Sequence, residues 1–404
     1  MNRRQICLVY IDSGGGHRAA AEALVEVVRR QHRPWDLHTV SIQDLLDPID
    51  FIRKSTGIRF QELYNIMLRN GWTLGTAQTI PVMHGLIRAS HEAQVRVLRR
   101  FWERNRFDLV VSLIPHYNRA LRESLDLARP GTPYVTLLTD IADYPPHFWI
   151  ERMDQWAICG SGRAVEQALT IGLPADRILR TSGMILHPRF YAPLEIDRRA
   201  ERRRLGLDPE RPAGLVLFGG EGSAGMVHIA QVLNDAASGV QLILLCGRNE
   251  AVAAQLRAMP KRIPMLVAGF TREVPYYMEL ADFFIGKPGP GSISEALAKR
   301  LPVIVQRNAW TMAHERYNAD WVERLGVGIA VGSFPREIGG AVRTLLEPEN
   351  YRRYRERAAA CRNQAVFEIP QMLEEILERP CAGAACSGRF APGLPRTSSA
   401  SSAK

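Results

Sequence analysis

The chain opens with a short apolar run that ends in a turn of three glycines. Residues Ile6–Ile11 are all apolar, as in a strand that is buried on both faces of a parallel sheet. Gly14–Gly16 form the turn, and Ala20, Leu24 and Val28 then follow at helical spacing. A buried strand joined by a glycine turn to an amphipathic helix is the repeating unit of doubly wound α/β domains.

The same alternation continues along the chain, stops, and starts again. Residues 186–199 are rich in proline and charge and show little periodicity, which indicates a linker. A length of 404 residues is also typical of two domains. The remaining strand-like runs are Leu109–Leu113 and Tyr134–Leu138 before this linker, and Leu215–Phe218, Gln241–Leu245, Met265–Val267, Phe283–Ile285 and Val303–Val305 after it.

We therefore expect an α/β fold in which two Rossmann-like domains, residues 1–185 and 200–365, face a cleft. A closing helix is predicted at 366–379, with Pro370 in its first turn, packing back on the first domain. Residues 380–404 consist of Ala, Gly, Ser, Pro and a few basic residues, and they are predicted to be disordered.

The charge of the chain favours an anionic partner. There are 52 Lys and Arg against 42 Asp and Glu, a formal charge of +10, which suits a phosphorylated ligand, an acidic membrane surface or nucleic acid. No nucleic-acid motif is recognised, so we expect no nucleic-acid partner. The six cysteines lack CxxC spacing, and no apolar run approaches the roughly 18–20 residues that span a bilayer. These features predict a cytoplasmic protein.

More than half of the net charge lies in residues 50–106, which hold ten basic and four acidic residues. Aromatic residues such as Phe51, Tyr64 and Trp72 are interleaved with them. This composition suits a surface that meets an anionic membrane peripherally and admits a lipid. The alternative is a helical excursion that packs on the sheet and leaves its arginines solvated.

Glycine turns end three of the strand-like runs, at residues 13–17, 219–223 and 286–292. Glycine permits a close backbone approach, and a following helix N-terminus offers free N–H groups to an anion. None of the turns matches the Walker or Rossmann fingerprint, but together they predict a phosphate-bearing ligand between the domains. Glu295, one turn into the helix after the third turn, would accept hydrogen bonds from ribose hydroxyls. Alternatively, it complements the helix N-terminus.

Several of these stretches carry a family resemblance that runs from about residue 5 to about residue 378. The chain resembles the diacylglycerol glycosyltransferases, namely the monogalactosyldiacylglycerol synthases and their processive glucosyltransferase relatives. It resembles more distantly the transferase that makes the peptidoglycan lipid precursor. The stretches are GGGHRAAAEAL (14–24), TDI (139–141), FGGEGS (218–223), LLCGRN (244–249), VAGF (267–270), GKPGPGSISEAL (286–297) and HERYN (314–318).

The resemblance implies a GT-B fold, a UDP-hexose donor, inversion of the anomeric centre, and no cofactor or active-site metal. It also assigns nine residues of the second half to the donor. Gly269 and Phe270 would frame the uracil, and Glu295 would hold the ribose. Gly220, Arg248, Gly291 and Ser292 would contact the diphosphate, and Glu315 and Asn318 would bind the hexose.

On the first domain, the resemblance places His17 opposite the anomeric carbon, with Gly15 and Gly16 as an acceptor or phosphate loop. A histidine with an ordinary pKa near 6.5 suits the removal of a proton from the attacking hydroxyl. Asp140 is predicted either to orient His17 or to replace it as the base. His147 is assigned no role, and His314 stands where the family has glutamine, which leaves the hexose open.

The expected function is transfer of a hexose from a UDP-sugar to a lipid, diacylglycerol above all, at the cytoplasmic face of the membrane. Two enzymatic alternatives are transfer to another lipid or small molecule, and an epimerase or hydrolase of UDP-N-acetylglucosamine. A third alternative is a basic nucleic-acid or membrane-binding protein with a degenerate nucleotide cleft. The presence of His17, Glu295, Glu315 and Asn318 argues against degeneracy.

Overall fold

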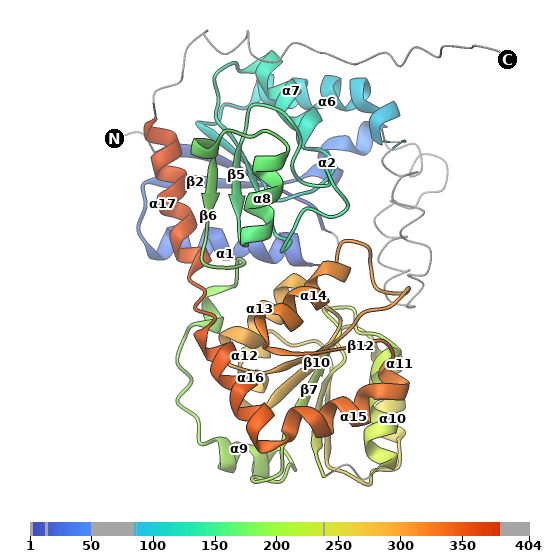
Figure 1. Ribbon diagram of the computed structural model, residues 1–404. Helices are drawn as coiled ribbons and strands as arrows, with labels where there is room; N and C mark the ends of the chain where they lie inside the picture. The colour runs from blue at the N-terminus through green and yellow to red at the C-terminus, as the bar shows by residue number, and fades with distance from the viewer. Residues whose placement is uncertain (1–2, 13–14, 50–84, 86, 237–238, 380–404) are drawn as a thin grey trace, which may run out of the picture.

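The chain folds into two α/β domains, each built on one parallel sheet (Figure 1). The computed structural model describes residues 3–12, 15–49, 85, 87–236 and 239–379. The first sheet consists of β1 (Arg4–Tyr10), β2 (Trp35–Ser41), β3 (Leu109–Ser112), β4 (Tyr134–Leu137), β5 (Trp156–Cys159) and β6 (Ile178–Arg180). The second sheet consists of β7 (Ala213–Leu217), β8 (Gln241–Leu245), β9 (Met265–Ala268), β10 (Phe283–Gly286), β11 (Val303–Gln306) and β12 (Gly328–Val331).

The strand orders are β2-β1-β3-β4-β5-β6 and β12-β11-β10-β7-β8-β9. The second order is that of a Rossmann fold, and the first is that of its flavodoxin-like variant. The order reverses between β1 and β3 in one sheet and between β7 and β10 in the other. Open parallel sheets bind their ligands at such switch points. The predicted fold class of two Rossmann-like domains is confirmed.

The predicted strand runs coincide with central strands and with one edge strand, β9. The central strand β5 and the other three edge strands, β2, β6 and β12, were not among the predicted runs. Several residues of β2 and all three of β6 are at least partly exposed, because an edge strand needs fewer apolar side chains. Their sequences therefore lack the continuous apolar pattern of a strand that is buried on both faces.

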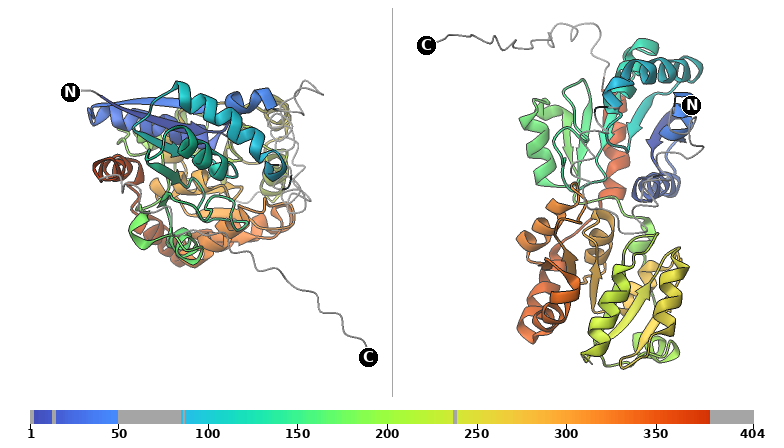
Figure 2. Two further views of the ribbon diagram at one scale, coloured as in Figure 1. Left: turned by 90° about the horizontal axis from the view of Figure 1, so that it is seen from above. Right: turned by 90° about the vertical axis from the view of Figure 1, so that its right-hand side faces the viewer.

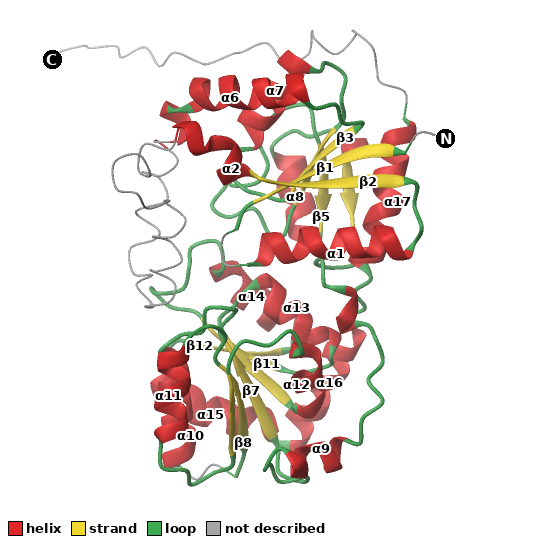
Figure 3. Cartoon of the chain, turned by 180° about the vertical axis from the view of Figure 1, so that it is seen from behind, coloured by secondary structure: helices red, strands yellow, loops and turns green. Residues whose placement is uncertain are grey.

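Helices cover both faces of each sheet (Figures 1 and 3). In the first domain they are α1 (Gly16–Arg30), α2 (Ile42–Leu46), α6 (His91–Arg104), α7 (Asn118–Ala128) and α8 (Gly162–Thr170). In the second domain they are α9 (Arg198–Arg204), α10 (Gly225–Asp235), α11 (Glu250–Ala258), α12 (Val274–Leu280), α13 (Pro290–Ala298), α14 (Arg316–Leu325), α15 (Phe334–Leu346) and α16 (Pro348–Ala360). Short 3₁₀ helices span Asp47–Ile49, Ala175–Arg177 and Pro188–Phe190.

Helix α17 (Ala365–Glu378) follows the second domain but packs on the first, beside α1 (Figure 2). Its buried residues Val366, Ile369 and Leu373 join the core of the first domain. Pro370 lies inside this helix and not in its first turn. Apolar packing on the first domain offsets the hydrogen bond that a proline removes from a helix interior.

Two sequence predictions fall on parts of the chain that lie outside the described residues. The tail at 380–404 is one of them, and most of the basic segment, residues 50–84 and 86, is the other. Among the described residues, no helix is long and apolar enough to cross a bilayer.

Candidate active site

The first glycine turn leads directly into helix α1. Gly15 has a φ of +83°, which a residue with a side chain rarely adopts. A Cβ built on Gly15 or Gly16 would meet no atom of the described residues within 4 Å, which leaves room for a ligand at this turn. Gly14 lies outside the described residues. The turn places His17 at the start of α1, beyond the carboxyl end of β1.

His17 is half-buried against residues that follow β4. Its Nδ1 atom lies 2.9 Å from the Thr139 hydroxyl oxygen, and its ring centroid lies 5.6 Å from that of Trp149. Burial lowers the pKa of His17 below its usual value, while the charge of Asp140 opposes this shift. A lowered pKa keeps the imidazole neutral at neutral pH, the form that can accept a proton.

Asp140 acts on His17 through its charge and not as the partner of Nδ1. The Asp140 carboxylate is buried and accepts a hydrogen bond of 2.8 Å from the Trp149 indole nitrogen. Of the two predicted roles, orientation of His17 through its Nδ1 therefore belongs to Thr139 in this geometry. Asp140 instead fixes Trp149, which packs beside His17.

The loop that carries Trp149 is held by Asp143. The Asp143 carboxylate accepts backbone hydrogen bonds from His147, Trp149 and Ile150 at 3.2, 2.7 and 3.4 Å. Burial raises the pKa of Asp143 to about 6, although these hydrogen bonds oppose the shift. His147 itself is exposed, so its contribution to this loop is its backbone.

On the second domain, the third glycine turn opens helix α13. The first hydrogen bond within this helix runs from the amide of Ile293 to the Gly289 carbonyl, at 3.1 Å. The amides of Gly291 and Ser292 precede it and have no partner within the helix. A Cβ on Gly291 would meet nothing within 4 Å. This helix end can therefore accept an anion such as a phosphate.

A buried ion pair connects this turn to the start of helix α14. The Lys287 ammonium donates to the Glu315 carboxylate at 2.8 Å, and Glu315 is only 5% exposed. Burial raises the pKa of Glu315, but the charges of Lys287 and His314 outweigh it and hold the pKa below its usual value. The Asn318 amide donates to the Pro288 carbonyl at 2.8 Å. Its Oδ1 atom is buried without a hydrogen-bond partner among the described residues.

The other two donor loops pack together at the ends of β7 and β8. A Cβ on Gly247 would lie 2.2 Å from the Gly220 carbonyl oxygen, so only glycine fits there. Arg248 donates its backbone N–H to that carbonyl at 2.9 Å. Its guanidinium lies 4.5 Å from the centre of the Phe270 ring. The loop after β9, with Gly269 and Phe270, is thus adjacent to the Gly220 turn.

Glu295 lies in α13 near the linker between the domains. Burial raises the pKa of Glu295 to about 7, and the charge of Arg189 opposes this shift. Arg189 belongs to the linker, and it donates to the Arg272 carbonyl at 3.1 Å, just beyond Phe270. The predicted ribose-binding carboxylate therefore faces a cation that the sequence analysis left without a role.

The two domains meet where the predicted base and the predicted hexose-binding residues lie. The rings of Phe148 and His314 stack across the interface, with centroids 5.7 Å apart and an angle of 13°. The charge of His314 also lowers the pKa of His17, so the two imidazoles are close in space. The Nδ1 atom of His314 is buried and has no hydrogen-bond partner among the described residues. An unsatisfied buried atom of this kind marks a place that a ligand hydroxyl can satisfy.

Known proteins are similar to this chain in sequence. Residues 215–366 match the glycosyltransferase family 28 C-terminal domain. A probable monogalactosyldiacylglycerol synthase 2 of Oryza sativa subsp. japonica is 27% identical over 408 residues, covering 93% of this chain and 81% of the relative. Monogalactosyldiacylglycerol synthase 1 of Arabidopsis thaliana is 27% identical over 397 residues, with 93% and 72% covered. The second domain therefore matches this family of glycosyltransferases, and the whole chain is similar to the monogalactosyldiacylglycerol synthases.

The fold of this chain is also found among solved structures. A crystal structure of the Anabaena protein HepE in complex with UDP and glucose aligns over 93% of this chain and 99% of that one. Its TM-score is 0.52 at 17% sequence identity. At this identity, the similarity concerns the fold alone.

In this glycosyltransferase, the predicted donor residues follow neighbouring strands of the second sheet, and His17 and Asp140 follow strands of the first. Thr139, Lys287 and Arg189 join them but were not predicted. Thr139 and Lys287 stand inside the TDI and GKPGPGS stretches, so the motifs held a signal for both. Arg189 stands in the linker, where no local pattern indicates a ligand.

Proposed function

We propose that this chain transfers a hexose from a UDP-sugar to the hydroxyl of a lipid, diacylglycerol above all, with inversion of the anomeric centre. The observation that carries the proposal is the close approach of His17 on one domain to His314 on the other, next to Glu315 in the chain. The synthase relatives, which are named for a galactolipid, support the lipid acceptor. The solved neighbour with UDP and glucose supports the donor.

The donor would lie along the carboxyl edge of the second sheet. Phe270 and Gly269 would frame the uracil, and the Glu295 carboxylate would accept hydrogen bonds from the ribose. Preorganised amides of Gly291 and Ser292, at the N-terminus of α13, would stabilise the charge that develops on the leaving diphosphate. We expect this leaving-group stabilisation to need no active-site metal.

The hexose and its diphosphate would be held by four further residues. Gly220 and Arg248 would lie on the phosphate side, and the unpartnered Oδ1 of Asn318 would accept a hexose hydroxyl. The Glu315 carboxylate would accept another. Because Lys287 already keeps Glu315 ionised, its remaining lone pairs are available to a hydroxyl.

In the proposed reaction, the acceptor oxygen attacks the anomeric carbon while the bond from that carbon to the diphosphate oxygen breaks. The electron pair leaves with UDP, and the hydroxyl proton passes to Nε2 of His17. Nδ1 carries the other ring proton throughout and donates a hydrogen bond to the Thr139 hydroxyl oxygen, which fixes the tautomer. Gly15 and Gly16 leave the space beside His17 open to the acceptor.

Docking would take place at the cytoplasmic face of the membrane, and the described part of the basic segment supports an anionic surface as the partner. Helix α6 packs Val95, Leu98 and Trp102 into the core and exposes Arg96, Arg100 and Arg104 at a spacing of four residues. Such a basic helix face attracts anionic headgroups, at about 1 kcal/mol per residue near the surface. Flotation with anionic vesicles at low and high salt tests this step, and binding that ignores salt would contradict it.

The decisive experiment measures UDP release from UDP-galactose and UDP-glucose with and without vesicles that contain diacylglycerol. We expect release to require diacylglycerol and the product to be a β-linked glycolipid by mass and proton NMR. Release without any acceptor would instead indicate the hydrolase or epimerase alternative. A product that retains the α configuration would contradict the proposed inversion but not the proposed transfer.

A further inference from the structure

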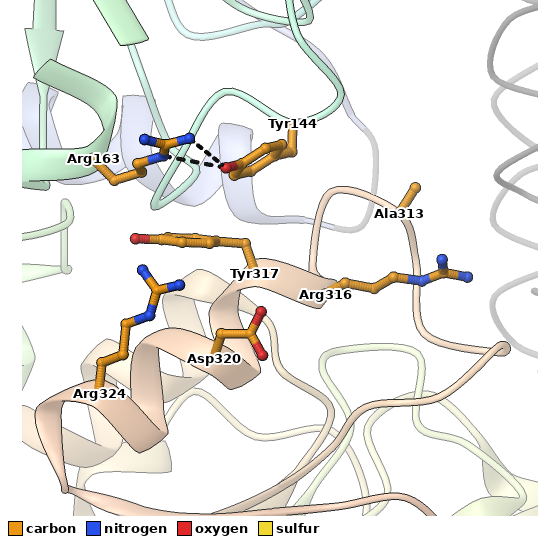
Figure 4. Close-up of a pocket in the computed structure, with 7 residues that line it drawn as sticks. All are labelled: Tyr144, Arg163, Ala313, Arg316, Tyr317, Asp320 and Arg324. Atoms are coloured by element: carbon orange, nitrogen blue, oxygen red, sulfur yellow. Dashed lines mark hydrogen bonds between the residues drawn. The ribbon is translucent and has the colours of Figure 1, made fainter. Parts of the chain in front are cut away.

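A second cavity lies between the domains, beside the site described above (Figure 4). Its volume is about 410 Å³. Tyr144 and Arg163 line it from the first domain, and the second domain supplies Ala313, Arg316, Tyr317, Asp320 and Arg324. None of these seven residues has been assigned to the donor, the acceptor or the base.

The cavity has a positive charge that its own residues do not neutralise. Its one carboxylate, on Asp320, is paired with Arg307, which does not line the cavity. Arg316 is held by two backbone carbonyls, those of Thr311 and Ala309. Neither Arg316 nor Arg324 forms an ion pair with a carboxylate within the described residues.

The third cation, Arg163, is held in place mainly by a tyrosine. Its Nε and Nη2 atoms donate to the Tyr144 hydroxyl at 3.2 and 2.9 Å, as the dashed lines of Figure 4 show. Its only carboxylate partner within the described residues is Glu166, at 3.1 Å, which is 66% exposed and easily screened. The neutral Tyr144 hydroxyl therefore holds the guanidinium in position without neutralising its positive charge.

Aromatic rings connect two of these cations, Arg163 and Arg324, across the domain interface. Arg163 lies 5.8 Å from the Tyr144 ring centre, and the Tyr144 and Tyr317 rings are 5.3 Å apart. Arg324 lies 5.5 Å from the Tyr317 ring centre. Each of these cation–ring contacts restricts a long side chain before any ligand arrives. The cavity is thus a cationic space that exists only while both domains contribute to it.

The cavity is separate from the donor site. Tyr317 and Arg324 both line the cavity from helix α14. They are about two helical turns apart, so they lie on the same side of this helix. Asn318 occupies the neighbouring, buried side of that helix and contacts the Pro288 carbonyl. A ligand in the cavity and a donor on the glycine turns would therefore contact different sides of α14.

We propose that this cavity is a second ligand site, for the phosphate group of a monoester or diester. Arginine is suited to this task because its planar fork matches two phosphate oxygens at once. The phosphate can come from a soluble phosphorylated metabolite or from a lipid headgroup. Because the walls come from both domains, the ligand favours the domain arrangement seen here, and its binding is coupled positively to that of UDP.

Calorimetric titration of the full chain with glycerol 3-phosphate tests the proposal, first alone and then with UDP at saturation. UDP occupies the diphosphate turns, so phosphate binding that persists belongs to the second site. We expect Arg163→Gln/Arg324→Gln to weaken this binding about tenfold or more. Arg324→Gln alone, at an exposed position, should weaken it to a smaller extent without a risk to folding.

Arg353→Gln is the matched control, since Arg353 also stacks on a tyrosine, Tyr354, at 5.2 Å, but lies on α16 away from the cavity. Flotation with phosphatidylcholine vesicles, with and without phosphatidic acid, distinguishes the two sources of phosphate. Arginine-dependent binding in either arm supports the proposal. The proposal would be overturned if UDP abolished the binding of glycerol 3-phosphate. It would also be overturned if the double variant bound as well as Arg353→Gln does, both in the titration and in the flotation. Neither result would bear on the glycosyl transfer proposed above.

Discussion

The Nδ1 atom of His17 lies 2.9 Å from the hydroxyl oxygen of Thr139. Thr139 stands directly before Asp140, so the loop after β4 acts on His17 in two ways. The threonine hydroxyl fixes the ring by a hydrogen bond, while the aspartate opposes, through its charge, the lowering of the pKa of His17 by burial. A single loop of the first domain therefore sets both the orientation and the basicity of this imidazole.

Thr139→Val should lower kcat and leave the donor KM unchanged. The substitution removes the hydroxyl that holds Nδ1 but keeps the shape of the side chain, and a neutral hydrogen bond is worth about two- to tenfold in rate. Steady-state kinetics with UDP-sugar and diacylglycerol vesicles measure the effect. Thr170→Val, an exposed position on α8, is the control. A rise in donor KM with unchanged kcat would show that Thr139 serves the donor instead.

His17→Asn should reduce kcat by about two to four orders of magnitude while UDP binds as in the wild type. The ordinary pKa of histidine is about 6.5. Because burial lowers the pKa of His17, this base becomes protonated only at a pH below that value. The acid limb of kcat should accordingly fall at a lower pH than a solvent-exposed histidine would give. A folded variant with the wild-type rate would remove His17 from the mechanism.

Donor affinity should rise with pH through about 7, the pKa of Glu295. Below this pH the carboxyl group is neutral and accepts ribose hydrogen bonds weakly, and above it both oxygens accept. UDP-glucose is the suitable probe because its diphosphate diester does not titrate there. Titrations from acid to mildly alkaline pH should show this rise in the wild type and in Glu323→Gln, a surface control. Glu295→Gln should bind weakly and without pH dependence.

Asp143 should make the protein less stable as pH rises from about 4 to about 6. Its pKa is about 6 in the folded chain, above its usual value, so the folded state holds the proton more tightly than the unfolded state does. The free energy of unfolding of the wild type, relative to Asp143→Asn, should therefore fall by about 3 kcal/mol over this range and level off above it. Urea denaturation followed by tryptophan fluorescence measures the difference. A constant difference between the two proteins would contradict the shift.

Lys287→Met should destabilise the second domain by about 1–3 kcal/mol, because it leaves the buried Glu315 carboxylate without its cation. Lys287 is itself one-third exposed, so the loss is smaller than for a fully buried pair. The double variant Lys287→Met/Glu315→Gln should recover most of it. Thermal denaturation of the wild type, the two single variants Lys287→Met and Glu315→Gln, and the double variant completes the cycle. Additive losses of stability would show that the two residues are not coupled.

Sequence patterns predicted all the central strands except β5, because strands that are buried on both faces are largely apolar. They did not predict edge strands such as β2 and β6, whose exposed positions tolerate polar residues. The glycine turns were found for a similar reason, since a positive φ at Gly15 or the close approach of the backbone at Gly222 restricts the residue type at that point. Thr139 and Arg189 were missed because their importance depends on partners that lie far away along the chain.

The sequence by itself determined the α/β class, the two sheets and the residues at the ends of their strands. These follow from local requirements, namely burial, periodicity and backbone conformation, which a short stretch of chain can express. Only the tertiary structure decided which of those residues meet. The His17–Thr139 contact, the Lys287–Glu315 pair and the arginine-lined cavity each join segments that are separated in the chain. Their distances follow from how the strands are ordered and how the two domains pack, and no local pattern encodes that packing.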